Sequence, residues 1–445
     1  MTILIKILQL ILSLSILVII HELGHFTAAK IFKTRVEKFY LFFDPWFSLL
    51  KFKHKETEYG VGWLPLGGYV KISGMIDESM DKEQMKLPPQ PWEFRSKPAW
   101  QRLIIMLAGV IMNIVLAFVI YMGLLAYFGE SYLPTQQVNK YGIAVDSLAR
   151  EMGFRDGDKI ISIGGQDVKN FQKIPIVIVL NQAKYATIVR NNDTMNIQFP
   201  DNTIRQLIKN NKSAGSLLEP RIPFVADRFE KGSPAQAAGL KAGDTIIGIN
   251  GQYLKYFTEF RNAIITHKNQ KIILTAKRGA DTLQLPVQLG ADGLLGVYPK
   301  NNLADFFKLD QKRYTMLQAI PAGITRTYDG IDNYLKQLKL MVTPKVEAYK
   351  NVGGFIAIGK IFPGIWDWES FWRLTAFLSI MLAILNILPI PALDGGHVLF
   401  LVYEIVARRK PSDKFLENAQ IAGMIILFSL LILANGNDIL KLFGH

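Results

Sequence analysis

Five consecutive residues have the types and spacing to hold a metal ion and to activate water beside it. His21-Glu22-Leu23-Gly24-His25 places two imidazoles four positions apart, with a carboxylate between them. On a helix, residues four apart share a face, so both imidazoles can bind one Zn²⁺. Glu22 lies about 100° around the helix from His21. There it can accept a proton from a water whose pKa zinc lowers to about 7.

A catalytic zinc ion takes three protein ligands, so the pattern requires a third residue far along the chain. The chain has no cysteine, so this ligand is a His, an Asp or a Glu. Asp394 is the preferred residue, because it ends an otherwise uncharged apolar run, and His397 is the alternative. Pro389 and Pro391, with two glycines after Asp394, break the expected helix and shape the site.

Four apolar stretches would position these residues, and each is long enough to cross a hydrocarbon layer of about 30 Å as a helix. They cover residues 3–20, 103–128, 374–393 and 418–437. Half of the residues are apolar, and the net charge is +14. The first stretch has no small-residue cleavage site after it, so we interpret it as a retained span. The basic residues gather in two loops, which favours membrane topology over nucleic-acid binding.

The distribution of basic residues predicts an orientation. Lys and Arg concentrate between the first and second spans and between the third and fourth. The positive-inside rule places these loops in the cytoplasm, and both termini and residues 129–369 outside it. The His21–His25 motif and Asp394 then lie at the cytoplasmic ends of two spans that run in the same direction.

Residues 58–72 predict a β-hairpin, with glycines among apolar and aromatic residues and a turn at 65–68. Its edge, with Gly67, Gly68 and Tyr69, could pair with an unwound substrate strand. A plain surface hairpin is the alternative. Asn386, a lone amide in an apolar run, could bind the substrate backbone or link two helices. For Asn113 we expect packing.

The segment between the second and third spans contains an internal repeat. Residues 147–166 align without a gap with residues 233–252, matching Gly157 with Gly243 and Asp158 with Asp244. A repeat of this length indicates a duplicated small domain with a short helix, a Gly-Asp turn and an apolar strand. From Met316 to Val346 the apolar spacing predicts an amphipathic helix on the membrane or on the second domain, interrupted by Pro321 and Pro344.

The chain resembles the site-2 protease family of intramembrane zinc metalloproteases, and within it the bacterial regulator-of-sigma-E protease group. The matching runs, in the family's order, are 21–25, 64–71, 108–113 and 386–397. The resemblance implies one Zn²⁺ held by His21, His25 and Asp394 rather than His397, with Glu22 as base. It implies substrate contact at Asn386, a membrane-re-entrant β-loop at 58–72, and two PDZ domains of the bacterial protease type. One departure is Gly353-Gly354-Phe355, where relatives often carry Gly-Pro.

The expected fold is a multi-pass α-helical membrane protein with four spans, a membrane-associated β-hairpin and two extracytoplasmic α+β PDZ domains. The four spans are 1–28, 101–129, 371–396 and 418–438. The other segments are a cytoplasmic or re-entrant β region at 29–100, PDZ domains at 130–217 and 218–305, an amphipathic helical region at 306–370, and a cytoplasmic loop at 397–417. The expected location is the inner membrane of a bacterium, with the PDZ domains in the periplasm.

The expected activity is hydrolysis of a peptide bond inside the transmembrane helix of a single-pass membrane protein. By resemblance, the substrate is a pre-cleaved anti-sigma factor or a remnant signal peptide. The PDZ domains would capture peptide C-termini or act as a size filter. A non-catalytic membrane scaffold that presents PDZ domains, and a metal transporter, are the alternatives. Nucleic acid is not an expected partner.

Overall fold

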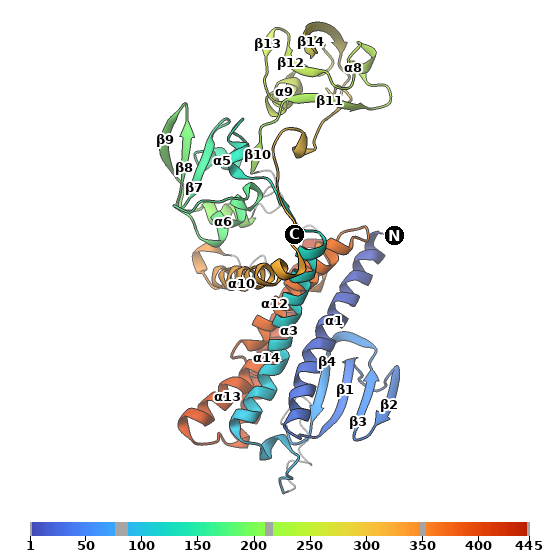
Figure 1. The fold of residues 1–445 in the computed structure, drawn as a ribbon, viewed down its shortest axis with the longest axis vertical. Helices are drawn as coiled ribbons and strands as arrows, with labels where there is room; N and C mark the ends of the chain where they lie inside the picture. The colour runs from blue at the N-terminus through green and yellow to red at the C-terminus, as the bar shows by residue number, and fades with distance from the viewer. Residues whose placement is uncertain (1, 76–87, 210–216, 348–352, 443–445) are drawn as a thin grey trace. The chain divides into compact units, whose positions relative to one another are not determined.

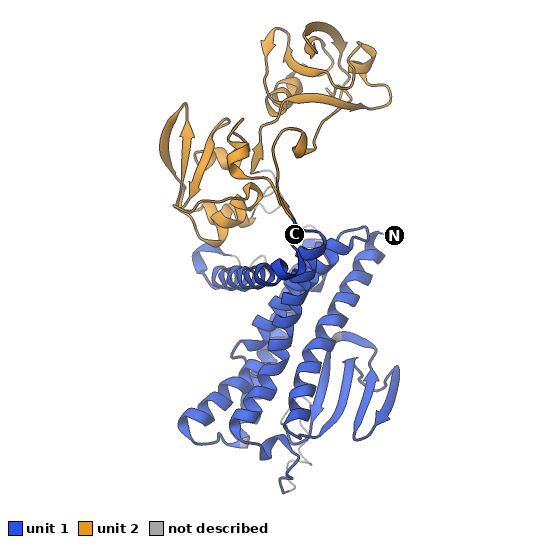
Figure 2. Ribbon diagram, viewed as in Figure 1, with its two compact units in different colours: residues 1–129, 313–445 blue, residues 130–312 orange. Residues whose placement is uncertain are grey.

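The chain divides into two units, which the computed structural model describes over residues 2–75, 88–209, 217–347 and 353–442. Unit 1 joins residues 1–129 to residues 313–445, and unit 2 is the insert, residues 130–312 (Figure 2). The metal-binding motif and Asp394 both belong to unit 1.

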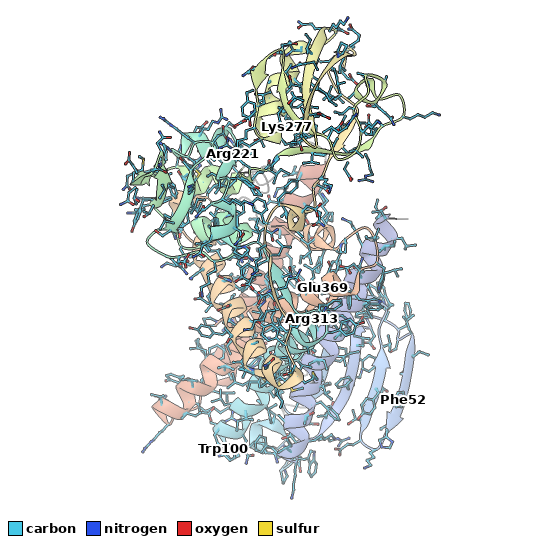
Figure 3. All side chains as sticks on the ribbon, turned by 45° about the horizontal axis from the view of Figure 1, so that its top comes forward. Phe52, Trp100, Arg221, Lys277, Arg313 and Glu369 are labelled. Atoms are coloured by element: carbon cyan, nitrogen blue, oxygen red, sulfur yellow. The ribbon has the colours of Figure 1, made fainter. Side chains whose placement is uncertain are left out.

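Within the described ranges, four helices are long and apolar enough to cross a membrane, which confirms the expected number. They are α1 (Thr2–Ile31), α3 (Ala99–Tyr127), α12 (Trp368–Ile387) and α14 (Asp413–Leu442). Helix α3 is central, because it packs against α1, α10 (Met316–Met341), α12 and α13 (Asp394–Ala407) (Figure 1). Many large apolar side chains of unit 1 are exposed, among them Phe52 and Trp100 (Figure 3), as expected of surfaces that contact lipid.

The third span ends earlier than predicted. Helix α12 stops at Ile387, Leu388 caps it, and a new helix, α13, begins at Asp394. Pro389 and Pro391 explain the break, because the residue before a proline avoids helical geometry and proline donates no hydrogen bond. The predictions of a span at 371–396 and a loop at 397–417 are therefore wrong, since Asp394 begins a helix that runs to Ala407.

The β region is a four-stranded sheet rather than a hairpin. Its strands are β1 (Val36–Phe43), β2 (Leu50–His54), β3 (Thr57–Val61) and β4 (Leu64–Ile72), in the order β2-β3-β1-β4. Strand β1 lies parallel to β3 and antiparallel to β4, so it separates the two strands that were expected to pair. The predicted turn at 65–68 lies inside β4. Pro65 is tolerated there because β4 is an edge strand.

Helix α10 begins with a capping box between Thr315 and Gln318 and continues through Pro321, contrary to the predicted interruption. Proline at this position removes one helical hydrogen bond, and the packing of α10 on α3 and α12 holds the helix together despite this loss. The face that packs on α3 and α12 includes Ile331, Tyr334 and Leu338. Leu317, Ile324, Tyr328 and Leu335 from the predicted apolar face are exposed instead.

The Gly353-Gly354-Phe355 run precedes a short helix, α11 (Phe355–Ile361), whose start is capped by α14. The buried Asp438 carboxylate accepts hydrogen bonds from the N–H groups of Gly354 and Ala357 at 3.0 and 2.8 Å. Asn435 Oδ1 accepts from the N–H of Phe355 at 3.2 Å. Backbone donors that a helix start leaves open are thus satisfied by side chains from another helix.

Unit 2 contains two hydrophobic cores. The first includes Leu133, Phe154 and Leu218, and is completed by Phe307 from the far end of the insert. The second is built from residues 224–295. The sheet around the first core has the order β7-β8-β9, and the second sheet has the order β15-β14-β12-β11-β16.

Unit 2 mixes short helices with strands, several of which follow one another directly along the chain. The strands are β5 (Glu130–Tyr132), β6 (Ile143–Val145), β7 (Lys159–Ile163), β8 (Tyr185–Arg190), β9 (Asp193–Gln198), β10 (Leu218–Pro220), β11 (Phe224–Phe229), β12 (Thr245–Ile249), β13 (Gln252–Tyr253), β14 (Lys271–Arg278), β15 (Asp281–Gln288), β16 (Val297–Pro299) and β17 (Asp310–Lys312). The helices are α4 (Thr135–Val138), α5 (Ser147–Glu151), α6 (Ile174–Leu180), α7 (Thr203–Lys209), α8 (Pro234–Ala237) and α9 (Phe257–Ile264).

The two aspartates that the aligned segments match, Asp158 and Asp244, are each paired with an arginine in the same way. The buried Asp158 carboxylate accepts two hydrogen bonds from Arg190, at 2.8 and 2.7 Å. Asp244 is held in the same way by Arg278, at the same two distances. In both, the second carboxylate oxygen also accepts the backbone N–H three residues upstream. A buried carboxylate requires such pairing.

Candidate metal centre

Three donor atoms from two distant parts of the chain converge on one point. His21 Nε2 and His25 Nε2 come from α1 and lie 3.2 Å apart. Asp394 Oδ2, from the first residue of α13, lies 3.2 Å from the first nitrogen and 3.3 Å from the second. The structure therefore brings together the three residues that the sequence proposes as ligands.

The residues present fit a zinc ion. Donor atoms about 2.0–2.1 Å from a tetrahedral zinc lie about 3.3 Å from one another, and the three separations match this value. Asp394 Oδ2 is buried and makes no hydrogen bond to the described residues, although two imidazole nitrogens are nearby. An orphaned carboxylate oxygen facing two nitrogens is the arrangement that a bound cation satisfies.

The imidazole of His25 has its tautomer fixed by α3. Its Nδ1 lies 2.9 Å from the backbone carbonyl oxygen of Ile105, which can only accept a hydrogen bond. Nδ1 therefore has the proton, and the lone pair of Nε2 points to the centre of the three donors. Metal-binding histidines characteristically donate their second N–H in this way.

Glu22 lies beside the three donors. It is half-buried on α1, and it lines the same cavity as Val70 of β4. Gly67, Gly68 and Tyr69 of β4 line this cavity together with Val70, so β4 borders the site.

The connection between α12 and α13 places Asp394. Ala392 has a φ of +82°, a left-handed conformation that is strained for alanine. Its N–H donates to Gln420 Oε1 of α14 at 3.2 Å, which holds the strained residue in place. Gly395 fits tightly against this connection, because an added Cβ would lie 2.1 Å from the Leu388 carbonyl oxygen. The Asp394 carboxylate is also stabilised by its position at a helix N-terminus.

A cavity of about 600 Å³ surrounds the centre. Of the residues that the sequence analysis singles out, the lining contains His21, Glu22, His25, Gly67, Gly68, Tyr69, Asn386, Asp394 and His397. The lining does not include Pro389 or Pro391, which act on the site only through the course of the backbone. His397 also lines a second, smaller cavity next to the buried Arg102–Glu404 ion pair.

Two polar side chains of the lining are held in defined positions. The Tyr69 hydroxyl donates to Asp44 at 2.9 Å, and burial together with this bond raises the pKa of Tyr69, so the phenol stays neutral. The Asn386 amide lies 3.2 Å from His21 Nε2, at the rim of the donor triangle.

Two features of α3 at this site were not predicted from the sequence. Asn113, expected to serve packing, is fully buried, and its amide lies 3.2 Å from His21 Nδ1. An uncommon amide in a charge-free span was the only available signal, because the contact depends on how α1 and α3 pack. The contact of the Ile105 carbonyl with His25 leaves no signal in the sequence, since every residue has a backbone carbonyl.

The sequence model of peptidase family M50 matches residues 9–430. The chain belongs to peptidase family M50. Its similarity to curated bacterial family M50 proteins spans nearly the full length of both chains. It is 28% identical to "Protease RseP" of Yersinia pestis, over 99% of this chain and all of the relative. It is 28% identical to a "Putative zinc metalloprotease" of Neisseria meningitidis, over 98% of this chain and 99% of the relative.

Membership of family M50, together with these relatives, indicates that the chain is a metalloprotease. The names of the relatives support zinc as the metal. The four apolar helices agree with a membrane location.

Proposed function

We propose that the chain is an intramembrane protease that uses one zinc ion, held by His21, His25 and Asp394, to cut a transmembrane helix of another protein. The observation that carries this proposal is the triangle of donor atoms beside Glu22 on a helix apolar enough to span a membrane. His21 lies ten residues before the end of α1, which corresponds to about 15 Å along the helix axis. This depth supports a site below the surface of the bilayer.

The chemistry follows from the side chains around the donors. A bound zinc ion supplies a Lewis acid that acidifies water and polarises the scissile carbonyl. Glu22 accepts the proton of the attacking water and passes it to the leaving amine. The Asn386 amide is in reach of a peptide group bound beside His21.

The edge strand β4 supports binding of the substrate as an added strand. A transmembrane helix hides its scissile carbonyl in a hydrogen bond, so hydrolysis requires local unwinding. The freed backbone groups need new partners in the membrane interior, and the outer edge of β4 borders the cavity. Gly67, Gly68 and Tyr69 are the residues of β4 that we expect beside the substrate.

The orientation and location belong to the same proposal. Basic residues in both loops favour a cytoplasmic active-site end, with unit 2 in the periplasm of a bacterium. The two hydrophobic cores of unit 2 support the proposal that it consists of two PDZ domains. These domains would limit the size of a substrate's outer domain or bind peptide C-termini. Substrates of this kind are a pre-cleaved anti-sigma factor and a remnant signal peptide.

The decisive variant is Glu22→Gln, tested on the purified full chain with a tethered helical substrate. We expect zinc content to stay at that of the unmodified protein and cleavage to fall by about 10²–10⁴-fold. Glu56→Gln is the matched control, because Glu56 pairs with Lys30 away from the cavity and its loss leaves cleavage unchanged. Equal cleavage by Glu22→Gln and the unmodified protein would contradict the assigned base.

A further inference from the structure

A stripe of three residues on α3 faces both imidazoles of the metal centre. Ile105, Gly109 and Asn113 are spaced by four, so they lie on one face of the helix. The Ile105 carbonyl oxygen bonds His25, and the Asn113 amide contacts His21. Gly109 lies between them, and a Cβ there would be 2.3 Å from His25 Nε2 and 2.8 Å from His21 Cε1.

The orientation of the Asn113 amide determines which nitrogen of His21 has the proton. With Nδ2 toward His21 Nδ1, the imidazole accepts a hydrogen bond at Nδ1 and keeps its proton on Nε2. Nε2 then has no lone pair with which to bind a metal. Rotation of the amide by 180° exchanges Nδ2 and Oδ1 without moving other atoms. Oδ1 then accepts from Nδ1–H, and the Nε2 lone pair points toward His25 Nε2 and Asp394 Oδ2.

We propose that Asn113 is a positioning residue that sets the tautomer of His21 for metal binding, so that α3 supplies the outer partner of both histidine ligands. The inference rests on the metal site of the proposed function. Two observations support it: Asn113 is fully buried, and in the orientation that the structure records Oδ1 has no hydrogen-bond partner among the described residues. A buried amide with an unsatisfied oxygen beside an imidazole gains a partner when the amide rotates.

A purely structural role for Asn113 has a distinct signature. Its backbone carbonyl accepts a hydrogen bond from Ser379 Oγ of α12 at 2.7 Å, so residue 113 also takes part in the contact between α3 and α12. If this contact were its only role, Asn113→Leu would leave the metal site unchanged, because the variant keeps the backbone carbonyl that Ser379 bonds. If Asn113 orients His21, only Asn113→Leu affects metal affinity strongly.

The test measures zinc affinity of the full chain in detergent by competition with a chromogenic chelator. Asn113→Leu keeps the branched shape of the side chain and removes its polar atoms, and we expect it to weaken zinc binding by about 10–100-fold. Asn113→Asp keeps an acceptor, and Ser379→Ala removes only the packing contact. Both should stay within about threefold of the unmodified protein. Affinity of Asn113→Leu within threefold, or equal losses in Asn113→Leu and Ser379→Ala, would overturn the proposal.

A measurement on the unmodified protein covers the case in which Asn113→Leu does not fold. In ¹⁵N-histidine spectra of the zinc-loaded protein, His21 should show a slowly exchanging Nδ1–H and a metal-bound Nε2. A His21 bound to zinc through Nδ1 contradicts the proposal. Because the readouts are affinity and tautomer, they are separate from cleavage: a protein that binds zinc in this way but cuts no substrate contradicts the proposed function alone. Absence of stoichiometric zinc binding would overturn both.

Discussion

Gly24 of α1 and Gly109 of α3 lie against each other where the two helices meet. A Cβ on Gly24 would lie 2.9 Å from Gly109 Cα and 2.4 Å from the Ala108 carbonyl oxygen. The missing side chains allow the helices to approach at backbone distance, as small residues do in membrane helix pairs. Both glycines are next to metal-ligand side chains, so the same contact sets the geometry of the metal centre.

Gly109→Ala should therefore reduce metal binding. The added methyl group would overlap both imidazoles, so we expect zinc affinity to fall at least about tenfold. Gly123→Ala is the control on the same helix, because a Cβ at Gly123 would meet no atom of the described residues within 4 Å. Chelator competition on both variants checks this, and unchanged zinc affinity in Gly109→Ala would contradict the description of the contact.

Gly68→Ala should affect the substrate more than the metal. A Cβ on Gly68 would lie 2.6 Å from the Tyr40 carbonyl oxygen and from Val18 Cγ1, so β4 must shift relative to α1. We expect kcat/KM to fall at least about tenfold with zinc content unchanged. Gly436→Ala, on an open surface of α14, is the control. Full turnover by Gly68→Ala would show that the position of β4 is unimportant for cleavage.

Ala392→Gly should stabilise the protein. Alanine at a φ of +82° costs about 1–2 kcal/mol that glycine does not, so we expect a gain of about 1 kcal/mol in the free energy of unfolding. Ala392→Val should be destabilising, because a β-branched residue tolerates this conformation less well. Denaturation of both variants in the same detergent checks the order, and a less stable glycine variant would contradict the assigned strain.

The second core of unit 2 should weaken in acid through Asp244. Its hydrogen bonds with Arg278 hold the pKa of Asp244 below its usual range. Because the folded pKa lies below the unfolded value of about 3.9, the pair stabilises the core fully above about pH 4. This stabilisation is lost as the pH falls through the folded pKa.

Asp244→Asn removes this dependence. At pH 7 we expect amide hydrogen exchange in residues 224–295 of the full chain to be several-fold faster in the variant. The difference from the unmodified protein should shrink below about pH 4. Residues around the first core, where Asp158 and Arg190 remain, serve as the internal control. A difference that stays constant with pH would show that the charge of Asp244 does not contribute.

Local patterns identified much of this arrangement, and long-range contacts account for the errors. Two imidazoles four residues apart, and an acidic residue after an apolar run, are readable because helix periodicity and the cost of charge in lipid act locally. The position of β1 between β3 and β4 was not readable, because strands show their propensity but not their partners. The contact of Asn113 with His21 likewise depends on how two helices cross.

Asp394 shows the same limit at a single residue. Its role as a ligand candidate followed from its charge and depth, but its position at the start of α13 depends on the strained connection at Ala392 and on Gln420 of α14. No pattern within ten residues of Asp394 indicates a partner on α14.

The burial of Phe307 in the first core of unit 2 has a consequence for biosynthesis. The ribosome makes residues 133–218 first, but their core lacks Phe307 until almost ninety further residues have been added. The second core, at 224–295, has all of its residues by then. A nascent chain arrested near residue 300 would therefore have a complete second core and an incomplete first core. The first core, although it is synthesised first, would be the part that quality-control proteases can attack.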